Sequence, residues 1–181
     1  MPVTTTRTLP AAILREVQKA VIGKDLVLTK VLLAFLAGGH VLMEDMPGVG
    51  KTTLAMAFSK ALGLNCRRVQ FTPDVLPSDL TGFSVYEKNT GTFVFQPGAL
   101  FCHLLLADEI NRTSSKTQAA LLEAMEEGNV TVEGKTYALP RPHLVIATQN
   151  PLGCVGTQSL PESQLDRFLM RLHICLLYTS P

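Results

Sequence analysis

The sequence has few cysteines, and their spacing excludes the usual disulfide and zinc-binding patterns. Cys66, Cys102, Cys154 and Cys175 lie far apart, and none belongs to a C-x-x-C pair or stands near a histidine at metal-ligand spacing. This pattern is typical of buried free thiols in a reducing compartment. We therefore expect neither a metal finger nor a disulfide framework.

Long basic runs and membrane signals are also missing. The formal net charge is +1, and no run of Lys or Arg is longer than Arg67-Arg68, so the sequence lacks the electrostatic footprint of a nucleic-acid or anionic-membrane binder. The N-terminus has no basic region followed by an apolar core, and Lys30, Gly38, Gly39 and His40 interrupt the longest apolar stretch. We predict a cytoplasmic protein with no membrane span, for which nucleic acid is an unlikely partner.

What the sequence does contain is enough apolar material for one globular domain. Apolar residues make up 46% of the 181 residues and charged residues 17%. Helical periodicity over residues 10–37, interrupted at Gly23, predicts two helices. Short apolar runs predict strands at 40–45, 67–72, 104–110 and 143–150, with helices at 52–62 and 115–127 between them. This alternation predicts a parallel sheet with helices on both faces.

Two further segments have the pattern of β-hairpins. The first, residues 83–95, turns around Asn89-Thr90-Gly91. The second, residues 129–139, turns around Glu133-Gly134-Lys135 and is expected to place Val130 and Val132 opposite Tyr137 and Leu139. The predicted fold class is therefore α/β, with two inserted hairpins.

The segment "LMEDMPGVGKTTLA", residues 42–55, predicts a phosphate-binding loop. It matches G-x-x-x-x-G-K-[ST] at Gly50, Lys51 and Thr52 and departs from it at Asp45, a residue type that tolerates unusual backbone angles. Lys51 would reach the β- and γ-phosphates, the Thr52 hydroxyl would bind Mg²⁺, and the following helix would direct its N-terminal dipole at the anion. The simpler alternative is a glycine-rich turn with an incidental lysine.

A second signal is the apolar strand "LLLADE", which ends in adjacent acids. Carboxylates are costly at the end of a buried strand unless they face a cation or a reacting water. In a nucleotide site Asp108 would bind Mg²⁺ and Glu109 would polarise the attacking water. The alternative is a helix N-cap formed by Asp108.

Two residues further along the chain complete the candidate site. Asn150 ends the strand "HLVIATQN" and could orient the attacking water, or could simply belong to an Asn-Pro turn. Arg167, in "LPESQLDRF", follows a short predicted helix, and its alternative role is a surface ion pair with Asp166.

With these motifs in order, the chain resembles the MoxR family of AAA+ ATPases over about residues 20–172. The resemblance is carried by "LAGGHVLMEDMPGVGKTTLA", "RRVQFTPDVLPSDLTG", "LLLADEINRTSSKTQAALLEAMEEGNVTVEG", "VIATQNP" and "LPESQLDRFLMR". It implies a P-loop NTPase fold, a three-layer α/β/α sandwich, and an ATP- and Mg²⁺-dependent ATPase. It also implies a ring, usually a hexamer, that assembles or activates partner proteins, commonly ones with von Willebrand factor A domains.

The resemblance assigns roles residue by residue. Asp108 and Glu109 match the Walker B pair, Asn150 the sensor-1 position, and Arg167 the arginine finger given to a neighbouring subunit. Val21 and Ile22 match the segment that packs against adenine. The hairpins match inserts that face the pore or the client. The residues that match the ATP-binding Walker A loop are Pro47, Gly48, Val49, Gly50, Lys51, Thr52 and Thr53.

The C-terminal end differs from the family pattern. After Arg171 the family continues into a helical lid, whereas this sequence ends in "LHICLLYTSP". We expect an ATPase core at residues 1–175, including N-terminal helices at 10–37, a non-native tail at 176–181, and no lid domain.

Two other functions compete with ATP-driven remodelling. One is a nucleotide-gated binding module without useful turnover, and the other is a DNA-working motor of the related chelatase and helicase branch. The missing basic patch argues against the motor. A P-loop GTPase would need an N-K-x-D motif, and the sequence has none.

Overall fold

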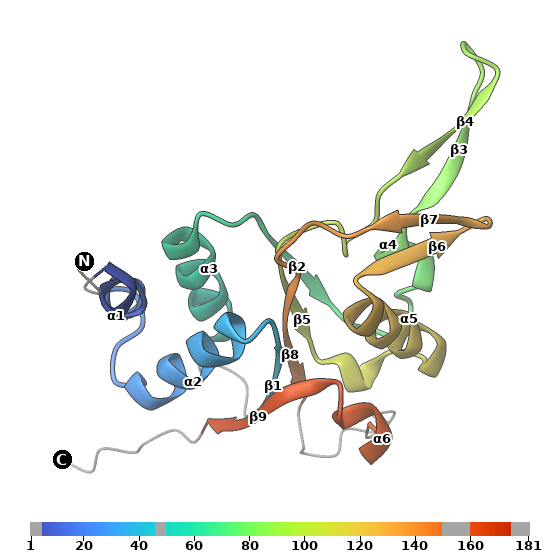
Figure 1. Cartoon of the computed structure of the whole chain (residues 1–181). Helices are drawn as coiled ribbons and strands as arrows, with labels where there is room; N and C mark the ends of the chain where they lie inside the picture. The colour runs from blue at the N-terminus through green and yellow to red at the C-terminus, as the bar shows by residue number, and fades with distance from the viewer. Residues whose placement is uncertain (1–4, 46–49, 150–159, 175–181) are drawn as a thin grey trace.

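The centre of the molecule is a parallel five-stranded sheet. The computed structural model describes residues 5–45, 50–149 and 160–174 (Figure 1). The strands lie in the order β2-β5-β8-β1-β9, and every neighbouring pair is parallel. Their bounds are β1 His40–Asp45, β2 Cys66–Gln70, β5 Leu104–Asp108, β8 Leu144–Gln149 and β9 Phe168–Ile174. Four of the five were predicted, and β9 was not.

Helices cover both faces of this sheet (Figure 1). One layer holds α1 Thr5–Gln18, α2 Asp25–Leu36 and α3 Lys51–Leu62. The other holds α4 Pro77–Thr81, the 3-10 turn η1 Ile110–Arg112, α5 Ser115–Glu127 and α6 Glu162–Leu165. The predicted three-layer α/β/α sandwich is confirmed.

The burial of β5 shows why its sequence lacks polar alternation. Leu104 and Leu106 pack into the core shared with α1, α2 and α3, whereas Leu105 and Ala107 pack into the core shared with α4 and α5. Successive side chains of a strand point to opposite faces, so a strand covered by helices on both sides is apolar throughout.

Two hairpins interrupt the strand-helix alternation, as predicted. They are β3 Phe83–Glu87 with β4 Thr92–Gln96, and β6 Asn129–Val132 with β7 Lys135–Ala138. The β3–β4 hairpin projects away from the body of the molecule (Figure 1). In the second hairpin Val130 faces Tyr137 as expected, but Val132 pairs with Lys135. Leu139 was expected on the arm opposite Val130 and Val132, but it lies beyond β7, buried in the core, because a two-residue turn at 133–134 sets the register.

Two further observations concern the cysteines and the possibility of a membrane-spanning helix. Cys66 and Cys102 are free, and burial raises the pKa of the Cys102 thiol to about 11, so it stays protonated near neutral pH. Over the ranges 5–45, 50–149 and 160–174, no helix has both the length and the apolar character needed to cross a membrane.

Candidate active site

The N-terminus of α3 lies at the carboxyl-end side of strand β1. Gly50, the N-cap residue, has φ +80°, a left-handed conformation that glycine adopts without strain. No side chain caps this helix end. The first N–H groups of a helix have no partner within the helix, so those of Lys51, Thr52 and Thr53 are free of intrahelical bonds and suited to an anion. Pro47, Gly48 and Val49 lie outside the described residues.

A threonine hydroxyl holds the two acids at the end of β5 in place. Thr148 of β8 is fully buried, and its hydroxyl donates to Asp108 Oδ1 at 3.0 Å. The same oxygen accepts the Glu109 backbone N–H at 2.9 Å. Thr148 therefore fixes the direction of the Asp108 carboxylate and the start of the turn that carries Glu109.

The second oxygen of Asp108 is held by Arg68 of β2. Arg68 Nε donates to Asp108 Oδ2 at 2.9 Å, and its Nη2 lies 2.8 Å from the same oxygen. The Asp108 carboxylate is nearly buried, and the guanidinium is half exposed. Arg68 thus neutralises the acid, and it occupies one of the oxygens that a metal ion would use.

Glu109 has a left-handed backbone, with φ +57° and ψ +49°. This conformation costs a non-glycine residue about 1–2 kcal/mol. It lets the chain leave β5 sharply and enter η1, and the Glu109 carboxylate accepts a hydrogen bond from Arg112 Nη1 at 2.8 Å. The side chain is 28% exposed, so it is open to water.

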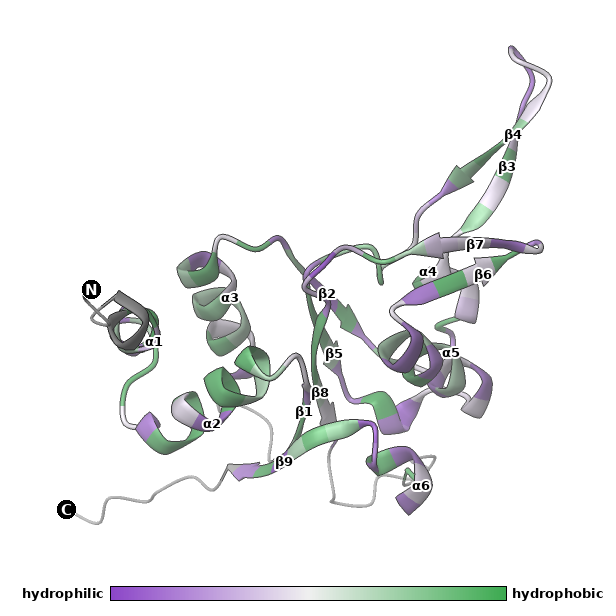
Figure 2. Cartoon of the chain, viewed as in Figure 1, coloured by the Kyte–Doolittle hydropathy of each residue, from purple (hydrophilic) through white to green (hydrophobic). Residues whose placement is uncertain are grey.

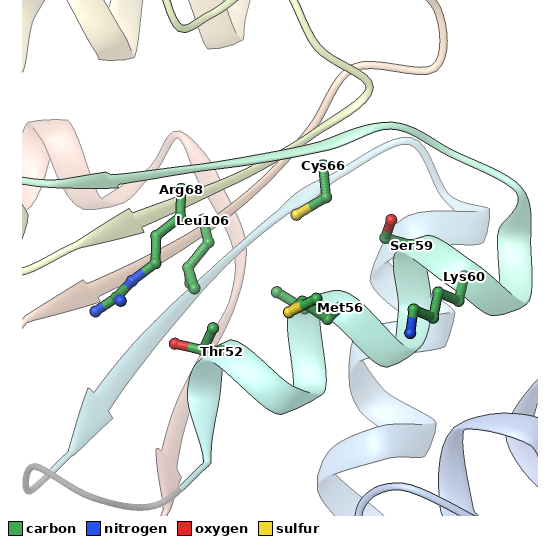
Figure 3. Close-up of a pocket in the computed structure, with 8 residues that line it drawn as sticks. Thr52, Met56, Ser59, Lys60, Cys66, Arg68 and Leu106 are labelled. Atoms are coloured by element: carbon green, nitrogen blue, oxygen red, sulfur yellow. The ribbon is translucent and has the colours of Figure 1, made fainter.

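A hollow of about 260 Å³ lies between α3 and the sheet. Figure 3 shows Thr52 at the start of α3 near Arg68, with the hollow continuing along the helix past Met56 toward Ser59 and Lys60. Its walls are mainly side chains of α3, β2 and β5. The hollow therefore follows the helix away from its phosphate-facing end, and we do not assign it to the nucleotide. It does show that Thr52 lies near the guanidinium that holds Asp108.

The donor groups near this edge fit Mg²⁺ bound together with a nucleotide. The hydroxyl of Thr52 and the carboxylate of Asp108 are oxygen ligands, which Mg²⁺ prefers. Among the residues that the structure describes, no three His, Cys, Asp or Glu side chains gather as a self-sufficient metal site.

A further group of polar side chains, centred on Glu44, was not predicted. Glu44 lies near the end of β1, and its carboxylate is almost fully buried. It accepts hydrogen bonds from Arg171 Nη2 at 2.9 Å and from the Gln149 amide, and His173 Nε2 lies 3.0 Å from its other oxygen. A carboxylate at the end of an apolar strand was the signal that could have pointed to this cluster.

The remaining predicted residues lie apart from this edge or outside the described ranges. Arg167 follows α6 and forms a 2.7 Å ion pair with Glu126 of α5, where the sequence had suggested Asp166 as the partner. Val21 is buried in the core with the N-terminal helices, whereas Ile22 is 87% exposed. Asn150 lies outside the described residues, although Gln149 before it ends β8.

Comparison with known proteins places the chain in a family. Residues 40–170 match the model of the ATPase family associated with various cellular activities (AAA). The chain is 54% identical over 159 residues to the uncharacterized protein YeaC of Bacillus subtilis, covering 88% of this chain and 50% of that protein. It is 42% identical over 174 residues to chaperone MoxR1 of Mycobacterium tuberculosis, covering 96% and 45%.

A solved structure agrees with these relatives. A protein from Cytophaga hutchinsonii, described as a "putative ATPase", superposes with a TM-score of 0.82 at 40% identity, covering 96% of this chain and 52% of that one. The chain spans about half the length of the curated relatives it matches. From the family match, the MoxR relatives and the shared fold, we conclude that the chain belongs to the AAA ATPases and, within them, to the MoxR family of AAA+ proteins.

Proposed function

We propose that this chain is the ATP-binding and ATP-hydrolysing core of a chaperone-like remodeller. The observation that carries the proposal is the Thr148 hydroxyl, which joins Asp108 and Glu109 at the carboxyl edge of a parallel sheet that also presents the uncapped start of α3. Ligands of open α/β sheets bind at this edge. A phosphate-binding helix end and a braced pair of acids on one edge support nucleotide hydrolysis.

The loop and the start of α3 would hold the phosphates. Pro47 would form part of the loop, backbone N–H groups from Gly48 to Thr53 would surround the phosphates, and the Lys51 ammonium would add a charge that the helix dipole alone does not supply. Thr52 and Asp108 would bind Mg²⁺, which neutralises phosphate charge when bound. For Asp108 to do so, the guanidinium of Arg68 has to share or release one carboxylate oxygen.

Glu109 and Asn150 would act on the attacking water. A partly exposed carboxylate at the turn after β5 can accept a proton from water, and an amide after β8 can orient that water. Arg112 is paired with Glu109 in this structure, so Glu109 would turn from Arg112 to the water during the reaction.

Arg167 would complete the site of a neighbouring subunit. Its ion pair with Glu126 joins two partly exposed side chains, and such pairs contribute about 0–1 kcal/mol. This energy is small compared with the effect of an arginine finger, which accelerates hydrolysis by roughly 10³- to 10⁵-fold, or about 4–7 kcal/mol of the barrier. Arg167 can therefore leave Glu126 when a ring forms, and we propose a ring, in the complete protein a hexamer.

Recognition of the base is proposed for the connection between α1 and α2. Val21 and Ile22 were predicted to pack against adenine, and their side chains differ in exposure. Ile22 is free to contact a ligand, whereas Val21 already packs in the core. We therefore propose that Ile22 makes the contact and that Val21 fixes its backbone.

The hairpins are proposed to contact the client protein. Large apolar side chains on β3 and β4 are exposed, and the hairpin projects from the body (Figure 2). These are Phe83, Val85, Tyr86, Phe93 and Val94. An exposed apolar group of this size commonly marks a protein contact. We propose a client with a von Willebrand factor A domain, reached in the cytoplasm and without nucleic acid.

Two substitutions test the assigned roles with a fluorescent ATP analogue and a phosphate-release assay. Lys51→Ala should abolish nucleotide binding, whereas Glu109→Gln should keep ATP bound and stop hydrolysis. Lys60→Ala, at an exposed lysine near the C-terminal end of the same helix, is the matched control and should change neither. Equal loss of binding in the Lys51 and Glu109 variants would contradict the roles. Binding without turnover in the unmodified protein would favour a nucleotide-gated module.

Mixing two inactive variants tests whether Arg167 acts as an arginine finger for a neighbouring subunit. Arg167→Ala and Glu109→Gln subunits should each be nearly inactive alone, and mixing them should restore some hydrolysis. An Arg167→Ala site keeps Glu109, and a Glu109→Gln neighbour can lend it an intact Arg167. If confirmed co-assembly restores nothing, Arg167 is only a surface ion-pair residue.

A further inference from the structure

Glu44 connects the ends of three parallel strands. In the register of the sheet it faces Gln149 on β8 and His173 on β9. Gln149 donates its amide N–H to one carboxylate oxygen, and His173 contacts the other. Arg171, two residues before His173 and thus on the same face of β9, also donates to Glu44. One carboxylate therefore joins β8, β1 and β9 at their carboxyl ends.

This carboxylate stays charged although it is buried. Burial by itself raises the pKa of Glu44, but hydrogen bonds from Arg171 and Gln149, the positive charge of Arg171, and His173 when it is protonated bring it below the ordinary value. A buried charge that loses its partners is strongly unfavourable, so the carboxylate holds its donors in place. The three donors are consequently fixed relative to β1.

The location of the cluster links it to the candidate active site. Strand β1 ends one residue after Glu44 and leads to the phosphate loop. Gln149 is the last residue of β8, one residue after Thr148, which holds Asp108 and Glu109. Thr148 and Gln149 are consecutive residues of a strand, so their side chains point to opposite faces of the sheet. Thr148 holds Asp108 and Glu109 on one face, and Gln149 is held by Glu44 on the other.

We propose that Glu44 is a positioning residue for ATP hydrolysis. Through Gln149 it fixes the carboxyl end of β8 against β1. This contact sets the spacing between the phosphate loop and the water-activating residues. The inference rests on the proposed hydrolysis at Glu109. Because Glu44 acts on β8, its loss disturbs the alignment of the water more than the grip of α3 on the phosphates. Small misplacements of reacting groups cost about 10²-fold in rate.

The test uses the full-length protein and two substitutions. Glu44→Gln removes the charge at constant shape, and Gln149→Met removes only the donor from β8 while Glu44 keeps Arg171 and His173. Each should lower kcat by about 10- to 100-fold and leave the Kd of a fluorescent ATP analogue within about threefold. The double variant should lose no more activity than either single one, because both break the same link.

A matched control and two readouts separate the possible results. Glu162→Gln, an exposed acid on α6 that lines the same surface hollow as Arg171, should leave kcat unchanged. If Gln149→Met keeps full kcat, or if kcat falls only in proportion to the folded fraction seen in thermal melts, the proposal is overturned. Should Glu44→Gln fail to fold, Gln149→Met decides alone. If the unmodified protein does not hydrolyse ATP, the proposed function is refuted. If the unmodified protein is active, the Glu109→Gln variant is inactive and the Gln149→Met variant is fully active, only the role proposed for Glu44 is refuted.

Discussion

Replacing Thr148 with valine removes one hydroxyl that serves two acids. Valine has nearly the shape of threonine, so the fully buried site keeps its packing. The substitution deletes the hydrogen bond to Asp108 Oδ1 and leaves the Glu109 backbone N–H without its acceptor. The change therefore reports on hydrogen bonding more than on volume.

The expected loss of stability follows from these two bonds. A hydrogen bond to a charged group contributes about 1.5–3 kcal/mol, and a neutral one about 1 kcal/mol. Thr148→Val should therefore lower the free energy of unfolding by about 2.5–4 kcal/mol. Hydrolysis should fall further than the folded fraction, because the turn that carries Glu109 loses its anchor.

Urea unfolding and phosphate release measure the two effects, with Thr148→Ser as the control. Serine keeps the hydroxyl and loses one buried methyl group, a deletion that costs about 0.5–1.5 kcal/mol. The serine variant should therefore retain most of its turnover. If the valine variant is as stable and as active as the serine variant, the Thr148 hydroxyl does not hold Asp108 and Glu109 in place.

Three other perturbations test separate parts of the structure. His40 donates from Nε2 to the Met125 carbonyl and accepts the Val145 N–H at Nδ1, and burial lowers its pKa, so the unfolded chain binds the proton more readily. The contribution of His40 to the free energy of unfolding should be complete above about pH 6.5 and should decrease as the pH falls below that value. In urea titrations between pH 7 and 5, the His40→Gln variant should therefore show a smaller change of stability with pH. An unchanged pH dependence would mean that other groups cause it. Arg68→Met frees an oxygen of Asp108 and should lower the Mg²⁺ concentration needed for half-maximal ATP binding, whereas a higher requirement would show that Arg68 supports the metal site. Shortening the β3–β4 turn at residues 88–91 should leave the melting temperature nearly unchanged and weaken client binding, since the turn is exposed; a large fall in melting temperature would make the hairpin part of the core.

The sequence predicted the layers because each element has a strong local signal. The apolar run 104–107 and the glycines after α2 and α3 mark where elements run and end, and both hairpins have turn residues at the right spacing. Strand β9 lacked such a signal, because it opens with the consecutive apolar residues Phe168, Leu169 and Met170 soon after the four-residue helix α6. A short apolar run of this kind does not by itself distinguish a strand from another buried segment.

The ion pairs around the candidate site could not be predicted for a different reason. Arg68 reaches Asp108 across 40 residues of sequence, and Arg171 reaches Glu44 across 127. Which side chains meet depends on strand order and register, and a shift of one residue would turn every side chain to the other face. The motifs identified the acids, whereas the pairing partners required the three-dimensional sheet.

The left-handed backbone of Glu109 means that activity and stability favour different residues at this position. Glycine or asparagine would adopt φ +57° with less strain, so a chain selected only for thermal stability would not carry glutamate here. Glu109→Gly removes the carboxylate and the contact with Arg112, yet it relieves the backbone. A screen for heat-resistant variants would therefore enrich inactive proteins at residue 109, and stabilising this protein without loss of turnover has to begin elsewhere in the fold.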